Sequence, residues 1–435
     1  MKKKVLALLL TVSTMLSLVS CGLFGDNKNV EGKDGANVLS VWCWDSFNVD
    51  AMKAAAAIYE KDHPGKKIEV IEKGTKDIQS LVETYAICDQ LDSLPDVFLM
   101  DDQVFAKYLQ NYPEVFYDLT DSGINFDKFA QSKVANSVKK GNNYGVPYDS
   151  NTVIACYRTD YLEQAGYTIE DLTDITWDEF IKIGEDVLAK TGMPMLTNVK
   201  GEPDLLNMIL QSAGISVFDE NGNIALTNND GLKVAMKVYI DLVKKGILQE
   251  KEDWSGYQGS INNGNVVGTI NGSWICATIM STEQKEQDGN WAVTNMPKLN
   301  DYEGATNYSA QGGSTWALSS STDSYDLAVD FFKTIWAGNT EFYDGILTDL
   351  GAIATYLPAA NSEAYKQTSD YFGGEAIYSK IVSFGENIPT VNKGIYWAEE
   401  KKALGIALIK VLNGKIDLDS AIEEAQIMVE FSAGQ

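Results

Sequence analysis

The stretch VLSVWCW at residues 38–44 opens the folded part of the chain and sets its architecture. It is short, apolar and rich in β-forming residues, which predicts a strand. Apolar residues then recur at helical spacing as far as Tyr59, and KIEVI at 67–71 predicts a second strand. A helix is expected over 78–91 and a third strand over 96–100 (DVFLM). This order of strand, helix, strand, helix and strand is typical of a parallel sheet covered by helices, so the sequence predicts an α/β fold.

Polar and aromatic side chains follow the first and third of these strands. Trp44, Asp45 and Asn48 come after the first strand, and Asp101 and Asp102 come after the third. In open parallel sheets, ligands bind beyond the carboxyl ends of the strands. These residues are therefore candidate ligand contacts, although Trp44 could instead pack beneath a helix.

The same alternation continues to the end of the chain. Thr176 and Glu179 form a capping-box pattern that predicts the start of a helix. Asn221-Gly222 favours a hairpin turn, and two final helices are expected around 397–412 and 417–431. No repeat of fixed period and no long low-complexity insert interrupts the pattern.

The N-terminus reads as an export signal. Three lysines at positions 2–4 precede an apolar stretch at 5–18 that is too short for a spanning helix. The following LVSCG resembles the bacterial lipobox, which makes residues 1–20 a predicted signal peptide and Cys21 a predicted lipidation site. The alternative is an ordinary secretory signal in which Cys21 is incidental. Residues 21–37 are rich in Gly, Asn and Asp and are expected to form a flexible tether from the outer face of the membrane.

Composition excludes several classes of function. The 435 residues include 35 Lys and Arg against 61 Asp and Glu, a formal net charge of −26. Binding to nucleic acid needs clustered cations, so the sequence argues against it. The single histidine, His63, precludes sites with several histidine ligands. We predict no metal and no cofactor.

Four cysteines remain beyond Cys21, and their spacing matches no zinc or CxxC pattern. Cys43 and Cys276 lie in apolar runs and are interpreted as buried free thiols. Pairing in an exported protein stays open, with three possible arrangements for Cys43, Cys88, Cys156 and Cys276.

A family resemblance appears in the second half of the chain. Residues 218–279 carry FDENGN, then a helix ending in VKKG, then NNGNVVGTINGSW. NIP at 387–389, YW at 396–397 and LNG at 412–414 follow. In this order the segments resemble the extracellular solute-binding proteins (family 1) of sugar ABC transporters, the maltose-binding members in particular. The resemblance runs in the same order over residues about 38–431.

The resemblance implies two α/β lobes of the periplasmic-binding-protein-like type (class II), hinged by crossover strands. The first lobe would comprise 38–148 plus 309–353, and the second 149–308 plus 354–435. Lobes of this kind close on a ligand by hinge motion. The implied function is that of a monomeric, lipid-anchored receptor that delivers an oligosaccharide to the permease subunits of an ABC importer. It implies neither an enzyme nor a cofactor.

Five residues carry the sugar site that the resemblance implies in the second lobe. Sugars present weakly apolar C–H faces, which aromatic rings cover, and hydroxyls, which carboxylates and amides bind. Trp274 and Trp397 match the stacking tryptophans of the family, with core packing as the alternative for each. Glu202 matches a glutamate that binds sugar hydroxyls. Asp204 stands where the family has Tyr, and Asn151 where the maltose-binding members have Glu.

Five further residues complete the predicted set. Trp254 and Tyr257 are placed in a loop at the rim, Asp149 at the first crossover, and Gly313 at the second, where its lack of a side chain lets the backbone approach ligand. Gln103 ends a Met-Asp-Asp-Gln segment that lacks the Trp and Arg of the maltose-binding members. This difference argues against maltodextrin as the ligand.

The residues also suit functions of other classes. A glycosidase would need two carboxylates at a set separation, such as Glu202 with Asp101 or Asp102. With 61 acidic residues, chance pairs are expected, so this reading is disfavoured. A receptor for a non-sugar solute, such as a peptide or a polyamine, and a ligand sensor with the same fold both stay open. The sequence does not name the sugar.

Overall fold

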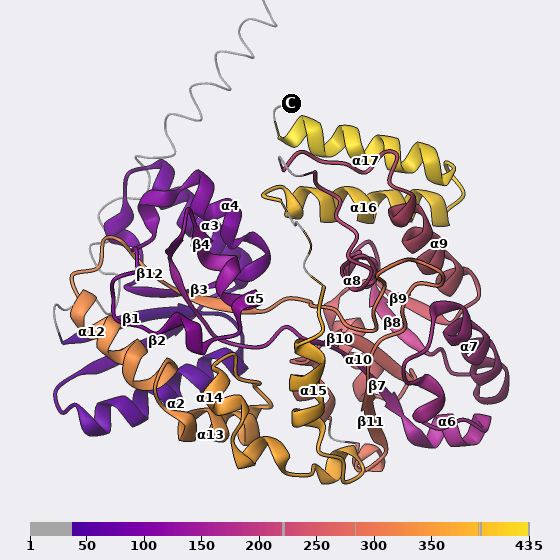
Figure 1. Ribbon diagram of the computed structural model, residues 1–435, viewed down its shortest axis with the longest axis horizontal. Coiled ribbons are helices and arrows are strands. Elements are labelled where there is room, and N and C mark those ends of the chain that lie inside the picture. The colour runs from indigo at the N-terminus through magenta and orange to yellow at the C-terminus, as the bar shows by residue number, and fades with distance from the viewer. Residues whose placement is uncertain (1–36, 220–221, 283, 390, 392–393, 434–435) are drawn as a thin grey trace, which may run out of the picture.

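The computed structural model describes residues 37–219, 222–282, 284–389, 391 and 394–433. The predicted signal peptide, Cys21 and the tether up to residue 36 lie outside these residues. The described chain forms two α/β lobes side by side, connected by extended segments that cross between them (Figure 1). Among the described residues, none of the helices combines the length and apolar character that a bilayer-spanning segment needs.

The first lobe is built on a five-stranded sheet of order β2-β1-β3-β12-β6. The three strands expected at the start of the chain are confirmed, and β1 pairs in parallel with both β2 and β3. β12 is antiparallel to β3 and to β6, so a later segment of the chain completes the sheet. The strands are β1 (Val38–Cys43), β2 (Lys67–Glu72), β3 (Val97–Asp101), β6 (Gly145–Pro147) and β12 (Ser314–Leu318).

Helices cover both faces of this sheet. Trp42 and Trp316 are both buried in the core of this lobe. Trp336, in the short turn that follows α12, packs its ring 5.4 Å from that of Trp316. The helices of this lobe are α2 (Ser46–Asp62), α3 (Thr75–Ile87), α4 (Asp102–Asn111), α5 (Gln131–Val134), α12 (Tyr325–Phe331), α13 (Thr340–Leu350) and α14 (Leu357–Ala360).

The second lobe has β7 at the centre of an antiparallel sheet between β10 and β11. β8 and β9 form a parallel pair. The backbone N–H of Gly268 donates to Met195 O at 2.9 Å and connects this pair to β10. The strands are β7 (Val153–Arg158), β8 (Leu196–Val199), β9 (Leu248–Lys251), β10 (Gly268–Gly272) and β11 (Trp291–Thr294).

The helices of the second lobe include the predicted capping box, with Thr176 and Glu179 each accepting from the other's backbone N–H. The two final helices are also confirmed. The loop predicted for Trp254 and Tyr257 is wrong, because both lie on α10 behind the N-cap Asp253. The helices are α6 (Thr159–Ala165), α7 (Trp177–Thr191), α8 (Asp204–Ser212), α9 (Asp230–Lys244), α10 (Trp254–Asn262), α11 (Ile275–Met280), α15 (Ile377–Gly385), α16 (Trp397–Leu412) and α17 (Leu418–Ser432).

The segments that cross between the lobes are held together by isolated backbone bridges. Asp149 pairs with Ala354, and Thr152 pairs with Ala310. After Ala354 the chain still packs on the first lobe, because α14 contacts α13 and the turn at Glu363–Lys366 contacts α13 as well. We propose that the first lobe extends to about residue 366, beyond the boundary expected at 353.

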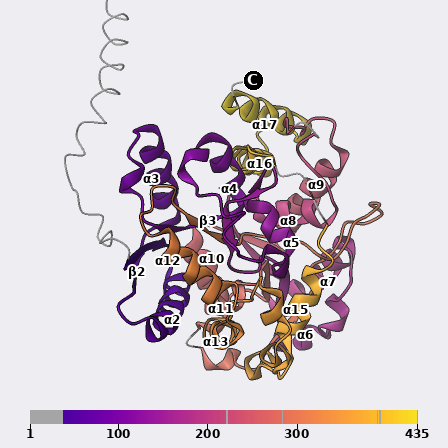
Figure 2. The ribbon, with the colours of Figure 1, turned by 60° about the vertical axis from the view of Figure 1, so that its left-hand side comes forward.

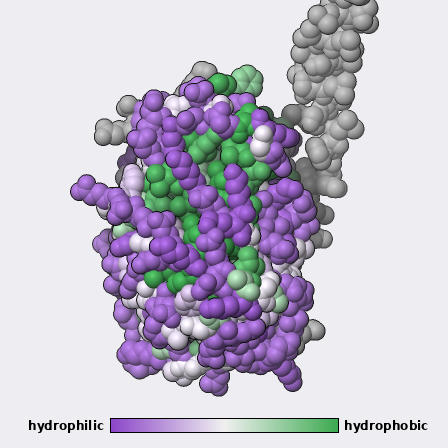
Figure 3. Space-filling view, turned by 90° about the vertical axis from the view of Figure 1, so that its right-hand side faces the viewer, coloured by the Kyte–Doolittle hydropathy of each residue, from purple (hydrophilic) through white to green (hydrophobic). Residues whose placement is uncertain are grey.

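The lobes also touch through helices. α16 of the second lobe lies against α4 of the first (Figure 2), and Lys107 of α4 forms an ion pair with Glu399 of α16. Figure 3 shows apolar side chains gathered on the outer face of the second lobe. Ile427, on α17 of the same lobe, is 62% exposed. Folded chains expose some apolar surface in any case.

The four described cysteines are unpaired. Cys43 and Cys276 are buried, which confirms their interpretation as core thiols.

Candidate functional site

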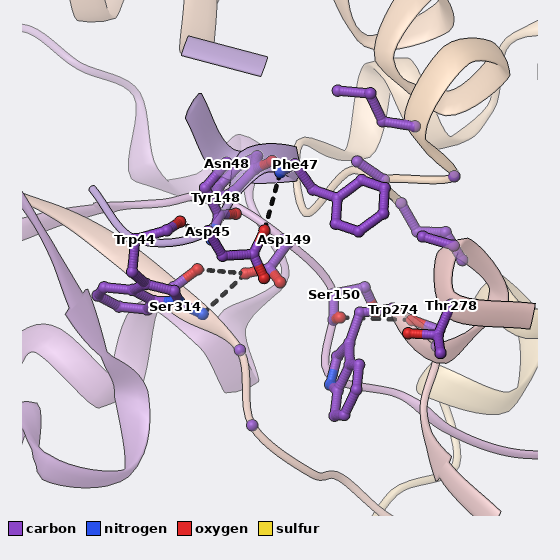
Figure 4. A pocket seen from close by; sticks show the side chains of 18 of the residues that line it. Trp44, Asp45, Phe47, Asn48, Tyr148, Asp149, Ser150, Trp274, Thr278 and Ser314 are labelled. Carbon is purple, nitrogen blue, oxygen red and sulfur yellow. Dashed lines mark hydrogen bonds between the residues drawn. The ribbon is translucent and has the colours of Figure 1, made fainter. Parts of the chain in front are cut away.

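A cavity of about 340 Å³ lies between the lobes, where the crossing segments meet the ends of the strands. This volume is within the range of small-molecule sites. Both lobes contribute to its wall (Figure 4). We call it the main cavity. Its lining residues are Trp44, Asp45, Phe47, Asn48, Thr75, Asp101, Tyr148, Asp149, Ser150, Trp254, Gln258, Ser273, Trp274, Ala277, Thr278, Gly312, Gly313, Ser314, Leu350, Gly351, Ala352 and Ile353.

Trp44 and Asp45 reach the main cavity because the chain turns sharply after β1. Asp45 has a φ of 63°, and its Oδ1 accepts from the N–H of Phe47 at 2.8 Å, which caps α2. Asn48 Nδ2 donates to Trp44 O at 2.9 Å and fixes the same turn. Burial raises the pKa of Asp45. The turn therefore presents an indole and a carboxylate side by side.

Two more carboxylates come from a crossing segment and from β3. Asp149 Oδ1 accepts from the N–H and the hydroxyl of Ser314 at 2.7 and 2.8 Å. Asp101 Oδ1 accepts from the N–H of Gln103 at 2.8 Å and caps α4. Burial raises the pKa of Asp149, and it raises the pKa of Asp101 to about 6, with the charge of Asp102 adding to the effect. Both carboxylates are held by backbone donors before any ligand arrives.

Trp274 and Trp254 form the wall contributed by the second lobe. Their ring centroids lie 5.8 Å apart, and Trp274 Nε1 donates to Gln311 O at 3.3 Å. A side chain at Gly272 would collide with the Trp274 indole and with Gln311 O, so the glycine makes room for this indole. Trp44 lies on one side of the view in Figure 4 and Trp274 on the other, with Asp149 between them.

Tyr257 supports this wall from behind. Its ring stacks on Trp254 at 4.7 Å, while its hydroxyl bonds Thr269 at 2.6 Å and accepts from Asn271 at 2.9 Å. Only 2% of Tyr257 is exposed, so the rim position predicted for it is wrong. Tyr257 positions Trp254 instead.

Asp102 holds the second crossover in place. One carboxylate oxygen pairs with buried Lys133, and the other accepts from Thr315 Oγ1 at 2.6 Å. Gly313 has a φ of 93°, and a side chain there would run into this ion pair. Asn151 Nδ2 donates to Gly312 O at 3.3 Å. Asp102 and Asn151 therefore fix the crossing segments and do not line the main cavity.

A second, smaller cavity of about 40 Å³ lies beside α16. We call it the α16 recess. Beside it, Lys401 pairs with Glu202 at 3.2 Å and with Asp204 at 2.6 Å, and its Nζ lies 5.4 Å from the Trp397 ring centroid. Glu202 and Asp204 line neither cavity. The recess is lined by Gln103, Asn207, Leu210, Gln211, Ile215, Val217, Ala310, Gln311, Val391, Trp397 and Glu400.

The structure thus divides the predicted residues into three groups. Gln103 and Trp397 line the recess. Five predicted residues line neither cavity, namely Asp102, Asn151, Glu202, Asp204 and Tyr257. Those brought together in the main cavity are Trp44, Asp45, Asn48, Asp101, Asp149, Trp254, Trp274 and Gly313.

Sequence reasoning missed several wall residues. Gln258 lies one helical turn after Trp254 and could have been found had α10 been predicted. The segment 350–353 carries no motif and joins the cavity only through tertiary packing. Sequence reasoning also did not single out Lys401, which lines neither cavity. It forms ion pairs with two predicted residues, Asp204 on α8 and Glu202 just before that helix.

The arrangement suits neutral, hydroxyl-rich molecules. Indoles cover apolar faces, and carboxylates already fixed by backbone donors can accept from hydroxyls. Among the described residues, no group of three or more His, Cys, Asp or Glu side chains could hold a metal ion.

Comparison with known proteins agrees with this geometry. The family model described as bacterial extracellular solute-binding protein matches residues 54–373. The chain is 38% identical to a lactose-binding protein of Rhizobium radiobacter over 84% of this chain and 86% of that one. It is 23% identical to an arabinooligosaccharide-binding protein of Halalkalibacterium halodurans, over 85% and 84% of the two chains.

Solved structures share the fold. The binding protein associated with an ABC transporter of B. animalis subsp. lactis, in complex with β-1,6-galactobiose, superposes with a TM-score of 0.75 at 19% identity, covering 91% of this chain and 97% of that one. The lacto-N-biose complex of a Bifidobacterium longum binding protein gives a TM-score of 0.74 at 18% identity, covering 92% and 98%. The two-lobed architecture expected from the sequence is confirmed.

Proposed function

The chain belongs to the bacterial extracellular solute-binding protein family, and from this premise we propose that it captures an oligosaccharide in the main cavity and delivers it to an ABC importer. Lactose is the first candidate ligand, because the relative at 38% identity is named for it. Binding, rather than turnover, is the proposed activity.

One observation carries this proposal. Trp44 from the first lobe and Trp274 from the second reach the same cavity, together with Asp45, Asp101 and Asp149. Aromatic plates with carboxylates between them match the two kinds of surface that a sugar presents. Because the walls come from different lobes, a bound sugar would hold the lobes together, which supports hinge closure on the ligand.

Isothermal titration calorimetry with a panel of sugars tests the proposal. The panel comprises lactose, β-1,6-galactobiose, arabinobiose and maltotriose, with spermidine and a tripeptide as non-sugar members. We expect saturable binding of lactose or another member of the sugar set, with the sugar recovered unchanged. If spermidine is the only member of the panel that binds, the ligand of the main cavity is a cation and not a sugar. The carboxylates beside the indoles could bind such a cation.

The finer parts of the proposal concern the location and the partners. The predicted signal peptide and lipidation of Cys21 would anchor a monomer at the outer face of the cytoplasmic membrane, next to its permease subunits. Metabolic labelling with a fatty-acid analogue tests the anchor: wild type should take up label, and Cys21→Ala should not. A labelled Cys21→Ala protein would rule out this site. Uptake of the bound sugar by cells, lost when the permease is absent, separates transport from sensing.

A further inference from the structure

The wall of the main cavity carries several carboxylates and no cation. Asp45, Asp101 and Asp149 all line the cavity, and none of the described residues that line it is Lys, Arg or His. Each of the three accepts from a backbone N–H, which orients the carboxylate but adds no net positive charge. Like charges grouped in a partly buried site favour protonation of one another. Carboxylates that stay ionised here therefore need a positive charge from behind the wall.

Lys133 lies behind the wall, on α5 of the first lobe. Its side chain is 2% exposed, and its ammonium group forms an ion pair with the buried carboxylate of Asp102. Lys133 lines neither cavity, so it does not contact a ligand there. A buried ion pair often adds little net stability, because the loss of hydration offsets the attraction between the charges. The location of this pair beside the cavity therefore calls for a role other than stability.

Ser314 connects Lys133 to the wall. The backbone oxygen of Ser314 accepts from Lys133 Nζ at 3.5 Å. Its N–H and hydroxyl donate to Asp149 Oδ1 at 2.7 and 2.8 Å, as the dashed lines in Figure 4 mark. A side chain at Gly313 would collide with Lys133 Nζ, so the glycine lets the ammonium group come this close. A single residue of the second crossover thus separates the cation from a carboxylate of the cavity.

The charges around Asp149 act in opposite directions. Burial raises the pKa of Asp149, Lys133 opposes this increase, and Asp102 adds to it with a smaller effect than that of Lys133. The other ionisable groups beside Asp149 are Tyr148, whose pKa burial raises well above its usual value, and Asp45, which follows β1. Among these groups Lys133 is the one cation.

The same lysine acts on Asp101. Burial raises the pKa of Asp101 to about 6, the charge of Asp102 adds to the increase, and Lys401 and Lys133 both oppose it. Lys401 is already paired with Glu202 and Asp204 on the second lobe. Lys133 belongs to the same lobe as Asp101, so its effect does not depend on how the lobes meet.

We propose that Lys133 is a positioning residue for sugar binding, a buried counter-charge that keeps Asp149 and Asp101 ionised and holds the second crossover against them without contacting the ligand. The inference rests on the proposed function and adds to it a residue from outside the cavity.

The variants are chosen so that the protein still folds. Removing Lys133 alone would leave Asp102 as an unpaired buried charge, which strongly destabilises a fold. The double variant Lys133→Met/Asp102→Asn removes both charges and keeps an amide oxygen that can accept from Thr315. The control is Lys139→Met, which removes a half-buried lysine of the same lobe whose Nζ donates to Leu109 O at 2.6 Å.

The first test uses the empty protein and needs no ligand. Asp149→Asn is introduced into wild type, the double variant and the control, and thermal unfolding is followed at about pH 8. Without Lys133 the charge of Asp149 is less well compensated, so Asp149→Asn should raise Tm by at least about 2 °C more in the double variant than in wild type. In the control it should act as in wild type. Equal effects in all three backgrounds would overturn the proposal, because Asp149 would not respond to Lys133.

The second test measures sugar affinity by calorimetry at about pH 9 and about pH 6.5. Lactose is the probe, with β-1,6-galactobiose in its place if lactose does not bind. Relative to wild type, the double variant should lose at least about threefold more affinity at pH 6.5 than at pH 9, because its cavity carboxyls take up protons at higher pH. A purely structural role would lower the affinity by the same factor at both pH values. The ratio of control to wild type should not change with pH.

The outcomes separate this inference from the proposed function. If wild type binds sugar and the ratio of double variant to wild type is the same at both pH values, Lys133 only supports the fold and the inference is overturned alone. If wild type binds no sugar of the panel, the proposed function fails, and the positioning role fails with it whatever the thermal unfolding shows.

Discussion

The main cavity and the α16 recess both combine tryptophan with carboxyl groups, and they differ in how those carboxyls are held. In the main cavity, Asp45, Asp101 and Asp149 each accept from a backbone N–H. In the recess, Glu400 has no partner among the described residues. The first arrangement is organised before ligand binds, and the second is complete only when something else supplies hydrogen bonds. Preorganised contacts should dominate affinity, whereas contacts of the recess should add selectivity.

The largest expected effect is a loss of sugar affinity, and it should differ between substitutions of Trp274 and Trp397. Trp274→Ala should weaken sugar binding at least about tenfold, because stacking on an aromatic platform contributes ~1–3 kcal/mol. Trp397 is only 8% exposed and lines the smaller recess, so Trp397→Ala should cost less affinity and more thermal stability. Calorimetry and thermal unfolding on both variants measure the contrast. A reversed order of affinities would place the main binding platform at α16.

The second prediction concerns the backbone that borders the main cavity. Gly313→Ala should destabilise the protein by about 1–3 kcal/mol, because Gly313 has a φ of 93° and an added side chain would meet the Asp102–Lys133 pair. Thermal unfolding measures the loss. Gly345→Ala serves as the control, since a side chain at this glycine on α13 meets nothing. If the two variants melt alike, the crossover tolerates rearrangement and does not fix the cavity.

The third prediction uses pH to test the carboxylates of the main cavity. The pKa of Asp101 is raised to about 6, so it is ionised at pH 7.5 and protonated below pH 6. Protonation removes an acceptor for sugar hydroxyls, and lactose affinity should fall severalfold between about pH 7.5 and pH 5. Asp101→Asn should flatten this profile. A wild-type affinity that is constant over this range would mean that Asp101 does not contact the ligand as a carboxylate.

The sequence predicts the strands and the residues at their ends better than it predicts contacts between segments that are distant along the chain. Trp44 and Asp101 follow directly from periodicity, because a strand that ends in polar residues leaves them at the sheet edge. Trp274 was identified by family resemblance. Asp102 could not be separated from its neighbour Asp101, since only the fold places Lys133 and Thr315 against it.

The sequence also does not predict which charged side chain is buried without a hydrogen-bond partner. Glu400 occupies an exposed-looking stretch, WAEEKK, in which four consecutive residues are charged. Helical geometry turns Glu400 into the protein, while Glu399 faces Lys107 of the other lobe and Lys401 faces α8. Which member of such a run is buried depends on the packing of α16, and no local pattern encodes it.

The smallest expected effect concerns the ion pair between Lys107 and Glu399, which joins the lobes beside the recess. Their side chains are 28% and 23% exposed. Partly exposed ion pairs contribute about 0–1 kcal/mol, so Lys107→Met should weaken ligand binding by less than about fivefold. Because salt screens such pairs, wild-type affinity should fall between about 20 and 500 mM NaCl, while the affinity of the variant should change less. The control Lys366→Met removes an exposed pair with Glu363 within one turn of the chain and should behave like wild type. If Lys107→Met weakens ligand binding more than tenfold, closure of the lobes depends on this ion pair more than on contacts with the ligand. The contact beside the recess would then affect affinity more than the main cavity does.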